Sequence, residues 1–404
     1  MEKLHGTFQL NKEESIHSWY PYLAGFSAEF VREKIREFNL DKNSKIFDPF
    51  AGVGTTLLVA KMSGIFSEGV EINPFASFVS DTKLYLEHDV GGLQKKKEDL
   101  LKLIRKEDYN LIDIGDMPAL LKRAFSPIIL KKLRMIRNTI YLEKQQQIKN
   151  LFLLALISIL KEVSNYKNFS PYLEARKEKI EDANVINLFS NKLNSMVEDV
   201  SNVNNKIHSK VYNLDARNLS FLESKFDLIV TSPPYLNNWD YSWITKIELL
   251  FMEIAENKQE LNEKVRNKLV TSSTYLLNKN SGKGSILPTS NVKIEIESLV
   301  LKLNKIRVKR GKNAKKYDLM VCDYFNDIYL ILKELRKIMN KGANSLWVVG
   351  DSALYGVHVP TDELIGKISE LVGFRYKGCK ILRDRMATRH DLKLRESVVV
   401  MEKK

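Results

Sequence analysis

The sequence predicts an α/β protein with a sheet flanked by helices, and with a helical insertion and a basic insertion. Three observations support this prediction. A strand, glycine turn, helix and second strand occupy residues 45–73, a short apolar strand ends at two prolines near residue 233, and strand and helix patterns alternate again from residue 318. Strands that alternate with helices in this way are typical of sheets covered on both faces.

The first predicted strand ends at Asp48 and leads into a glycine turn. Gly52 and Gly54 permit positive φ and let a ligand approach the backbone closely. The next strand ends at Glu71, whose carboxylate is placed to accept hydrogen bonds from ribose hydroxyls. The spacing is not G-x-G-x-x-G, and no lysine follows the glycines as in a P-loop, which argues against a triphosphate site.

The apolar run from Leu228 to Val230 predicts a second buried strand near the middle of the chain. It ends at Pro233 and Pro234, which cannot donate hydrogen bonds to a neighbouring strand. Ser232 and Tyr235 flank the two prolines, so a hydroxyl, a carbonyl and an aromatic face follow the strand directly. Ligands bind at the carboxyl ends of strands in open α/β sheets. The alternative is a proline-rich turn with a packed tyrosine.

Together these two stretches resemble the amino-methylating DNA methyltransferases that use S-adenosylmethionine. Residues 47–56 are similar to their cofactor motif, and residues 231–235 to their catalytic motif in the form most often seen in cytosine-N4 enzymes. Adenine-N6 enzymes more often carry Asp or Asn where Ser232 stands. The resemblance implies a Rossmann-like, seven-stranded methyltransferase sheet, and methylation of a cytosine that is flipped out of double-stranded DNA.

The resemblance also implies a set of site residues. The catalytic residues would be Ser232, Pro233, Pro234 and Tyr235. The Ser232 hydroxyl and the Pro233 carbonyl would accept hydrogen bonds from the N–H groups of the target amine, and Tyr235 would stack on the base. The cofactor-binding residues would be Tyr20, Phe26, Asp48, Phe50, Ala51, Gly52, Gly54, Thr55, Thr56, Glu71, Asp215, Ala216 and Thr231. Two alternatives stay open, because Tyr20 and Phe26 can instead staple the following helix to the sheet, and Asp215 can instead cap a helix.

The segment after Tyr235 is where a target base would enter. Asn237, Asn238 and Asp240 are candidates to bind the edge of the base, and Trp239, Tyr241 and Trp243 are candidates to wall its pocket. The alternative is an aromatic cluster packed under a loop.

Two long segments lie outside the resemblance. Residues 84–207 are expected to form the helical insertion, with a buried helix from Ile148 to Val163. Tyr166, Phe169 and Tyr172 lie among basic residues, a pattern that fits nucleic-acid stacking, although a loop packed on the helices is the better interpretation. Residues 257–317 are expected to form the basic insertion, a candidate target-recognition region that competes with the helical segment for that role. Residues 1–83, 208–256 and 318–404 then make up the catalytic domain.

The basic insertion ends in eight cations with no acid among them: Lys302, Lys305, Arg307, Lys309, Arg310, Lys312, Lys315 and Lys316. The whole chain carries a formal net charge of +14, which favours a polyanionic partner. We therefore expect these eight residues to bind DNA phosphates. The alternative is a solvated helix and loop.

The remaining observations narrow the class of protein. The two cysteines in 404 residues do not form a disulfide framework. We therefore expect a reducing compartment such as the cytoplasm. The longest apolar run, Leu151 to Leu160, is too short to span a membrane, so no membrane partner is expected. None of the six histidines has metal-ligand spacing, so no metal is expected.

Three other functions remain open at this point: a DNA adenine-N6 methyltransferase, an RNA base methyltransferase, and a non-catalytic DNA-binding subunit. The sequence has no apparent nuclease domain, so a cognate restriction endonuclease would be encoded separately. The last two strands are expected at residues 374–382 and 397–401, and the four arginines between Arg383 and Arg395 receive no chemical role.

Overall fold

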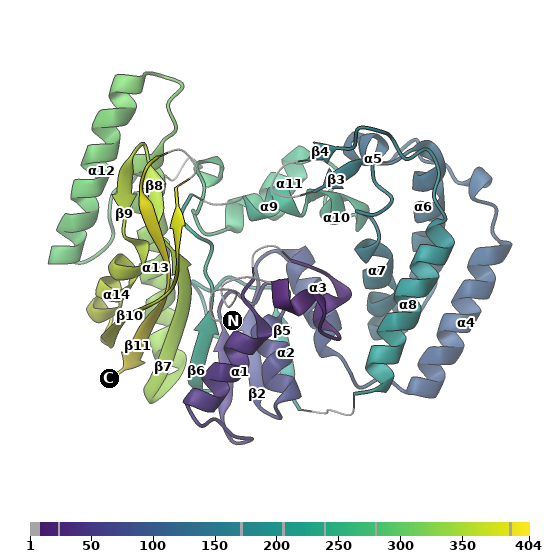
Figure 1. The fold of residues 1–404 in the computed structure, drawn as a ribbon, viewed down its shortest axis with the longest axis horizontal. Coiled ribbons are helices and arrows are strands. Elements are labelled where there is room, and N and C mark those ends of the chain that lie inside the picture. The colour runs from purple at the N-terminus through teal and green to yellow at the C-terminus, as the bar shows by residue number, and fades with distance from the viewer. Residues whose placement is uncertain are drawn as a thin grey trace.

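The computed structural model describes residues 9–22, 25–169, 173–203, 207–237, 240–278, 281–387 and 390–404, and its centre is a seven-stranded sheet in the order β10-β11-β7-β6-β1-β2-β5 (Figure 1). The strands are β1 (Lys45–Asp48), β2 (Phe66–Val70), β5 (Ser209–Tyr212), β6 (Phe226–Thr231), β7 (Met339–Gly350), β10 (Phe374–Met386) and β11 (Lys393–Lys403). Strands β7, β6, β1, β2 and β5 are parallel, and β11 runs antiparallel to both β7 and β10. The expected α/β fold with a seven-stranded sheet is confirmed.

The two strands that precede the sequence motifs are direct neighbours. Ile46 and Phe47 of β1 pair with Leu228 and Ile229 of β6, while Asp48 pairs with Gly69 of β2 on the other side. Because these strands are parallel, the glycine turn, the acid after β2 and the proline loop after β6 all emerge at one edge of the sheet. The chain order reverses at β1, and ligands bind at such a point in open α/β sheets.

Helices cover both faces of the sheet. Alternate residues of β6 point to opposite faces, as the two-residue repeat of a strand requires. Leu228 and Val230 pack with α1 (Ala28–Glu37) and α2 (Thr55–Met62), whereas Ile229 packs with α13 (Tyr317–Ile338) and α14 (Thr361–Leu371). Both faces of the central strands are therefore buried.

A helical lobe stands beside the β5 edge of the sheet (Figure 1). It consists of α4 (Val90–Lys106), α5 (Ala119–Ala124), α6 (Pro127–Tyr141), α7 (Gln146–Ser158) and α8 (Val185–Ser201), and α3 (Pro74–Leu84) joins it to the sheet. The small hairpin of β3 (Tyr166–Asn168) and β4 (Glu174–Ala175) lies within the same stretch of chain. Helix α7 is buried on nearly all sides, as its sequence predicts, although it ends at Ser158.

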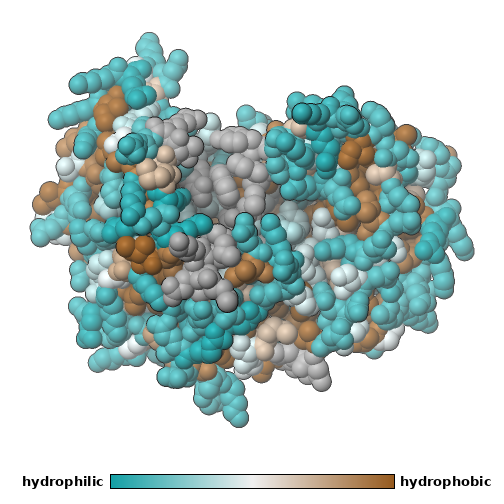
Figure 2. Space-filling view, in the orientation of Figure 1, coloured by the Kyte–Doolittle hydropathy of each residue, from teal (hydrophilic) through white to brown (hydrophobic). Residues whose placement is uncertain are grey.

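The other long segment is divided between two places. Short helices α9 (Tyr241–Ile244), α10 (Lys246–Phe251) and α11 (Lys258–Lys264) lie on the lobe side, and α12 (Asn291–Arg310) stands at the opposite end, packed on α13 and α14 (Figure 1). A hairpin of β8 (Ser352–Leu354) and β9 (Val357–Val359) lies near α12. Figure 2 shows that the surface is hollowed between α12 and the lobe.

The structure corrects two boundaries near the C-terminus. Strands β10 and β11 continue well beyond the expected residues, with bulges between Tyr376 and Gly378 and between Ile381 and Arg383. Arg383, Arg385 and Arg395 therefore belong to the hairpin rather than to a loop. Alternation of charged and apolar residues on a half-exposed hairpin hides its length from a search for apolar runs. Among the described residues, no helix has the length and apolarity needed to cross a membrane, and no cluster of His, Cys, Asp and Glu could hold a metal ion.

Candidate active site

Asp48 ties the two motif strands together from inside the protein. Its carboxylate accepts hydrogen bonds from the hydroxyls of Thr231 at 2.6 Å and Thr56 at 2.7 Å, and from the Phe50 amide at 2.9 Å. Burial raises the pKa of Asp48 to about 6, although these three donors oppose the shift. The end of β6, the start of α2 and the glycine turn are thus fixed by one buried acid.

Thr56, Thr231, Thr55 and Ala51 are themselves buried. Like Asp48, they do not line the pocket described below, whose lining residues are all described. These residues shape the turn from within the protein, and their contact with a cofactor stays a prediction.

Gly52 and Glu71 form the second link at this edge. Gly52 has a φ of 54°, and its amide donates to Glu71 Oε2 at 2.9 Å, while the Asn73 amide donates to Glu71 Oε1 at 2.7 Å. Burial raises the pKa of Glu71 to about 7, and the two amides oppose that shift. Gly54 has a φ of 86° and precedes α2, where an added Cβ would come within 2.5 Å of the Ser80 hydroxyl.

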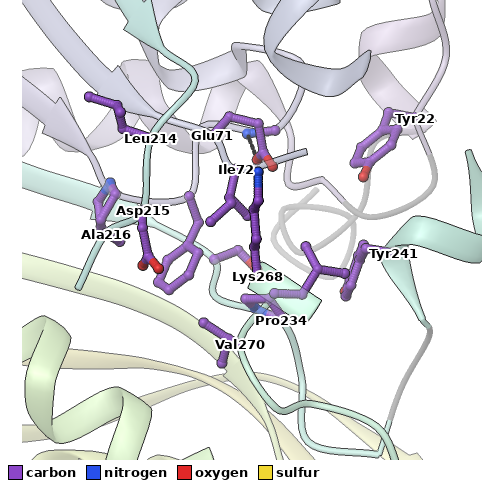
Figure 3. A pocket seen from close by; sticks show the side chains of 15 residues that line it. Tyr22, Glu71, Ile72, Leu214, Asp215, Ala216, Pro234, Tyr241, Lys268 and Val270 are labelled. Atoms are coloured by element: carbon purple, nitrogen blue, oxygen red, sulfur yellow. Dashed lines mark hydrogen bonds between the residues drawn. The ribbon is translucent and has the colours of Figure 1, made fainter. Parts of the chain in front are cut away.

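A pocket opens between these links and the proline loop (Figure 3). Leu214, Asp215 and Ala216 lie at one end, and Tyr22 and Tyr241 at the other, with Glu71 between them. The complete lining is Tyr22, Pro49, Phe50, Gly52, Glu71, Ile72, Leu214, Asp215, Ala216, Ser232, Pro234, Tyr241, Lys268, Leu269 and Val270. The glycine turn, the acid after β2 and the Ser-Pro-Pro loop therefore share one pocket.

Asp215 follows β5 and is held by a neighbouring arginine. Arg217 donates to both carboxylate oxygens of Asp215, at 2.7–3.0 Å, and to Asp327 Oδ1 at 2.8 Å. The Arg217 guanidinium also donates to the Lys268 carbonyl at 2.6 Å. Arg217 thereby fixes Asp215 at the pocket wall and attaches the segment around Lys268 beside it.

Ser232 and Pro234 line the pocket, whereas Pro233 is buried behind them. Tyr235 does not line this pocket, and its hydroxyl donates to Glu396 Oε1 on β11 at 3.0 Å. Glu396 is only 2% exposed and is also paired with Arg383. Burial, followed by the charge of Glu396, raises the pKa of Tyr235 well above its ordinary value. The C-terminal hairpin therefore supports the proline loop from behind.

Gly350, at the end of β7, gives Tyr235 its space. A Cβ at Gly350 would come within 3.0 and 3.1 Å of two ring carbons of Tyr235. The same Cβ would also clash with the Arg385 guanidinium, which lies 6.0 Å from the centre of the ring and donates to the Asp351 carbonyl at 2.7 Å. Sequence analysis gave the hairpin arginines no role, because only their place in the sheet brings them to the tyrosine.

The N-terminal segment reaches the pocket through a residue that was not predicted. Tyr20 donates to Glu248 on α10 at 2.8 Å and packs edge-on against Phe75, while Phe26 packs against Phe30 of α1. Neither Tyr20 nor Phe26 lines the pocket, but Tyr22 does. The predicted residues and Tyr22 belong to the same segment, and its packing decides which ring reaches the pocket.

Of the candidate base-binding residues after Tyr235, some line the pocket and others have structural contacts elsewhere. Tyr241 lines the pocket, whereas Trp243 packs against the helical lobe with the Lys246 ammonium 4.3 Å from its ring. Asp240 caps α9 and pairs with Arg266, so its carboxylate has a structural role. Asn237 lies just before α9, and its amide donates to the Ser272 carbonyl at 2.7 Å. Asn238 and Trp239 lie outside the described residues, as does Tyr172 in the lobe.

Lys268, Leu269 and Val270 are lining residues that sequence analysis missed. They follow α11 in the segment considered for DNA recognition, and contacts to residues far along the chain hold them in place. The Thr271 amide donates to Asp327 Oδ2 at 3.0 Å, for example. No local sequence pattern predicts that residues 268–270 line the pocket.

The eight predicted phosphate-binding cations lie far along the chain from the pocket motifs, on α12 and in the turn that follows it. Seven are exposed, while the Arg307 guanidinium binds the buried carboxylate of Asp318 at 2.8–2.9 Å. Arg310 stacks over Tyr355 at 4.4 Å. Arg307 thus holds α12 against α13, and the seven others keep their charge at the surface.

Comparisons with known proteins fit this site. No family model matches the chain. Type II methyltransferase M.BsoBI of Geobacillus stearothermophilus is 28% identical, over 98% of this chain and 87% of that protein. Type II methyltransferases M.AvaI of a Nostoc species and M.MvaI of Kocuria varians are 23% and 24% identical, over 93% and 90% of this chain and 82% and 83% of their own lengths.

Among solved structures, TrmN from Thermus thermophilus aligns with a TM-score of 0.29 and 10% identity, over 93% of this chain and 49% of that one, a likeness too low to carry an argument. The similarity to type II methyltransferases extends over nearly the whole chain. This similarity supports methyl transfer as the activity of the protein, which would then be an enzyme.

Proposed function

We propose that the protein is a site-specific DNA methyltransferase of a restriction–modification system, which transfers the methyl group of S-adenosylmethionine to N4 of a flipped-out cytosine. The observation that carries this proposal is that Gly52, Glu71 and Ser232 line the same pocket. The strand order, read from β5 to β10, fits the Rossmann-like sheet of the proposed class. The cognate endonuclease would be a separate chain.

The pocket residues fit the proposed cofactor. The side chains of Phe50, Leu214 and Val270 offer apolar surface for an adenine ring, and the Glu71 carboxylate keeps lone pairs for ribose hydroxyls beyond those used by its two amide donors. Gly52 lines the pocket, and a Cβ there would project to 3.8 Å from Tyr22. Asp215, at the far end, is the proposed acceptor for the adenine amino group.

When bound, S-adenosylmethionine supplies an electrophilic methyl group on its sulfonium. The protein has to orient the target amine, whose lone pair is conjugated with the ring. We propose that the Ser232 hydroxyl and the Pro233 carbonyl accept hydrogen bonds from its two N–H groups and so free that lone pair, with reacting atoms ~3–3.5 Å apart. The amine then exchanges one proton, lost to water, for the methyl group. Pro233 and Pro234 keep these acceptors rigid, and Tyr235, braced by Glu396, stacks on the base.

Ser232 favours cytosine over adenine as the proposed target, because a neutral hydroxyl at this position is the form that cytosine-N4 enzymes usually carry. The exposed cations Lys312, Lys315 and Lys316 would meet the phosphates of the duplex, and the hollow between α12 and the helical lobe (Figure 2) is the proposed place for the DNA. The helical insertion and the basic insertion would then form two sides of one DNA-binding surface on the catalytic domain.

Mass spectrometry of the methylated nucleosides tests this proposal. Purified protein is incubated with S-adenosylmethionine and unmethylated bacterial DNA, and the digested DNA is analysed for modified bases. We expect N4-methylcytosine. N6-methyladenine alone would keep the enzyme class and overturn the proposed target. Methylation of RNA in preference to DNA, or none of either nucleic acid, would overturn the proposed substrate.

A further inference from the structure

Helix α12 carries an unusual stripe on the face that points away from the rest of the protein. Ile294, Leu301 and Val308 are 62%, 62% and 67% exposed, and they recur at intervals of seven residues. The opposite face, which includes Ile296 and Leu303, is buried against α13 and α14. Seven residues fall about 20° short of two helical turns, so the three side chains form one nearly straight line along the helix.

The acidic residues of α12 all lie in its N-terminal half. That half holds Glu295 and Glu297 with one cation, Lys293, whereas the charged residues of the C-terminal half are all basic: Lys302, Lys305, Arg307, Lys309 and Arg310. Glu297 is 49% exposed and lies 4.0 Å from Lys293, and Lys305 is exposed with no acidic partner among the described residues. A continuous surface for DNA phosphates would have no use for the apolar line or for the acids.

We infer that this face pairs with α12 of a second copy of the chain, antiparallel and around a two-fold axis at Leu301. Two-fold symmetry brings residue i of one copy to residue j of the other, and j to i. Leu301 then meets Leu301, Ile294 meets Val308, and Glu297 meets Lys305 twice. The three apolar residues and both members of the charge pair are thus matched by one symmetry operation.

The interface is a modest one, because it uses a single helix from each copy. Standard stable interfaces bury ~1,600 Å² in total, and a helix pair offers less, so we expect a dimer in the micromolar range. The charge pair fixes the antiparallel direction, since a parallel pair would place Glu297 against Glu297. Lys305 then serves the dimer, whereas Lys312, Lys315 and Lys316, beyond the end of α12, stay free for DNA phosphates.

Sedimentation velocity of the full-length protein over a range of concentrations tests this inference. We expect wild-type protein to form dimers, and Leu301→Glu to weaken them at least about a hundredfold, because two like charges meet at the axis. Leu301 is exposed, so the variant should fold normally. Leu111→Glu, at an 84% exposed leucine in the helical lobe, is the matched control and should dimerise like wild type.

A charge exchange tests the direction of the pair. Glu297→Lys and Lys305→Glu should each weaken the dimer about tenfold, and the double variant should restore it to within about threefold of wild type. A wild-type protein that stays monomeric at about 100 µM would overturn the inference, as would a dimer that survives Leu301→Glu. If Leu301→Glu leaves a monomer unchanged but weakens duplex binding, the face contacts DNA instead. Neither result bears on methyl transfer, which the nucleoside analysis tests separately.

Discussion

The edge of the sheet and helix α12 hold their polar residues in opposite ways. At the sheet edge, Asp48 is buried and binds Thr231, 183 positions further along the chain. On α12, Glu297 is half exposed and its ion pair is with Lys293, one helical turn away. The buried hydrogen bonds of Asp48 fix the positions of the strand ends, whereas the exposed ion pair on α12 leaves its charges accessible at the surface. Substitutions at the sheet edge should therefore change folding and chemistry together, whereas substitutions on α12 should change association alone.

Replacement of Asp48 should produce the largest effect. Asp48→Ala leaves two hydroxyls and one amide without their acceptor, so we expect the free energy of unfolding to fall by about 2–4 kcal/mol. Urea denaturation measures this change. Lys302→Ala, on the exposed surface of α12 and outside the proposed charge pair, is the control and should stay within about 0.5 kcal/mol of wild type. Equal effects in the two variants would abolish the contrast between the two regions.

The next effect concerns the cofactor and its dependence on pH. The pKa of Glu71 is raised to about 7 by burial, and the ionised carboxylate is the better acceptor for ribose hydroxyls. Affinity for S-adenosylmethionine should therefore rise as the pH increases through about 7 and level off above it. Glu71→Gln should bind about tenfold more weakly at pH 8 and lose this pH dependence in calorimetric titrations. A glutamine variant with wild-type affinity would remove Glu71 from the ribose role.

The brace behind Tyr235 should affect turnover without affecting cofactor binding. Glu396→Gln weakens the acceptor for the Tyr235 hydroxyl, so we expect kcat to fall about fivefold while the KM for S-adenosylmethionine stays unchanged. Tyr235→Phe removes the same hydrogen bond from the other side, and the double variant should be no worse than either single variant. Additive losses would mean that Glu396 acts on something other than the tyrosine.

The smallest effect at physiological salt should come from the turn after α12. Neutralising Lys312, Lys315 and Lys316 should lower the slope of log affinity against log salt by ~0.9 for each phosphate contact that is lost. Fluorescence anisotropy with duplex DNA at several salt concentrations measures this slope. Neutralising Lys42, Lys341 and Lys404, three exposed lysines at the opposite edge of the sheet, is a control of equal charge. An unchanged slope in the triple variant would move the DNA to another surface.

Much of the sheet edge was predictable because its key residues are adjacent in sequence to strand ends. The glycine turn, Glu71, Asp215 and Ser232 all meet in the pocket as expected. Asp48 stays a predicted cofactor residue; the structure shows it buried between two strands and outside the pocket lining, because a motif specifies which residues occur and not which way they face. Tyr22 and the segment from Lys268 to Val270 depend on long-range packing that no local pattern encodes.

At the basic end of α12 the residue types were predictable from the sequence, but their contacts were not. Its charge was evident in the sequence, but the partner of Arg307 was not, because Asp318 lies across a turn on α13. Likewise, the length of the β10–β11 hairpin, and with it the contact between Arg385 and Tyr235, follows from pairing between these two strands rather than from apolar runs. A sequence shows which residues are charged, but the ion pairs that these residues form depend on the tertiary structure.

Single-turnover methylation by Ser232→Ala tests the central claim most directly, namely that the pocket beside the glycine turn delivers its methyl group to an amine held by Ser232. The account predicts a loss of about a hundredfold in the rate of methyl transfer, with the affinity for S-adenosylmethionine near that of wild type. A variant that binds the cofactor normally and transfers methyl groups at the wild-type rate would contradict it.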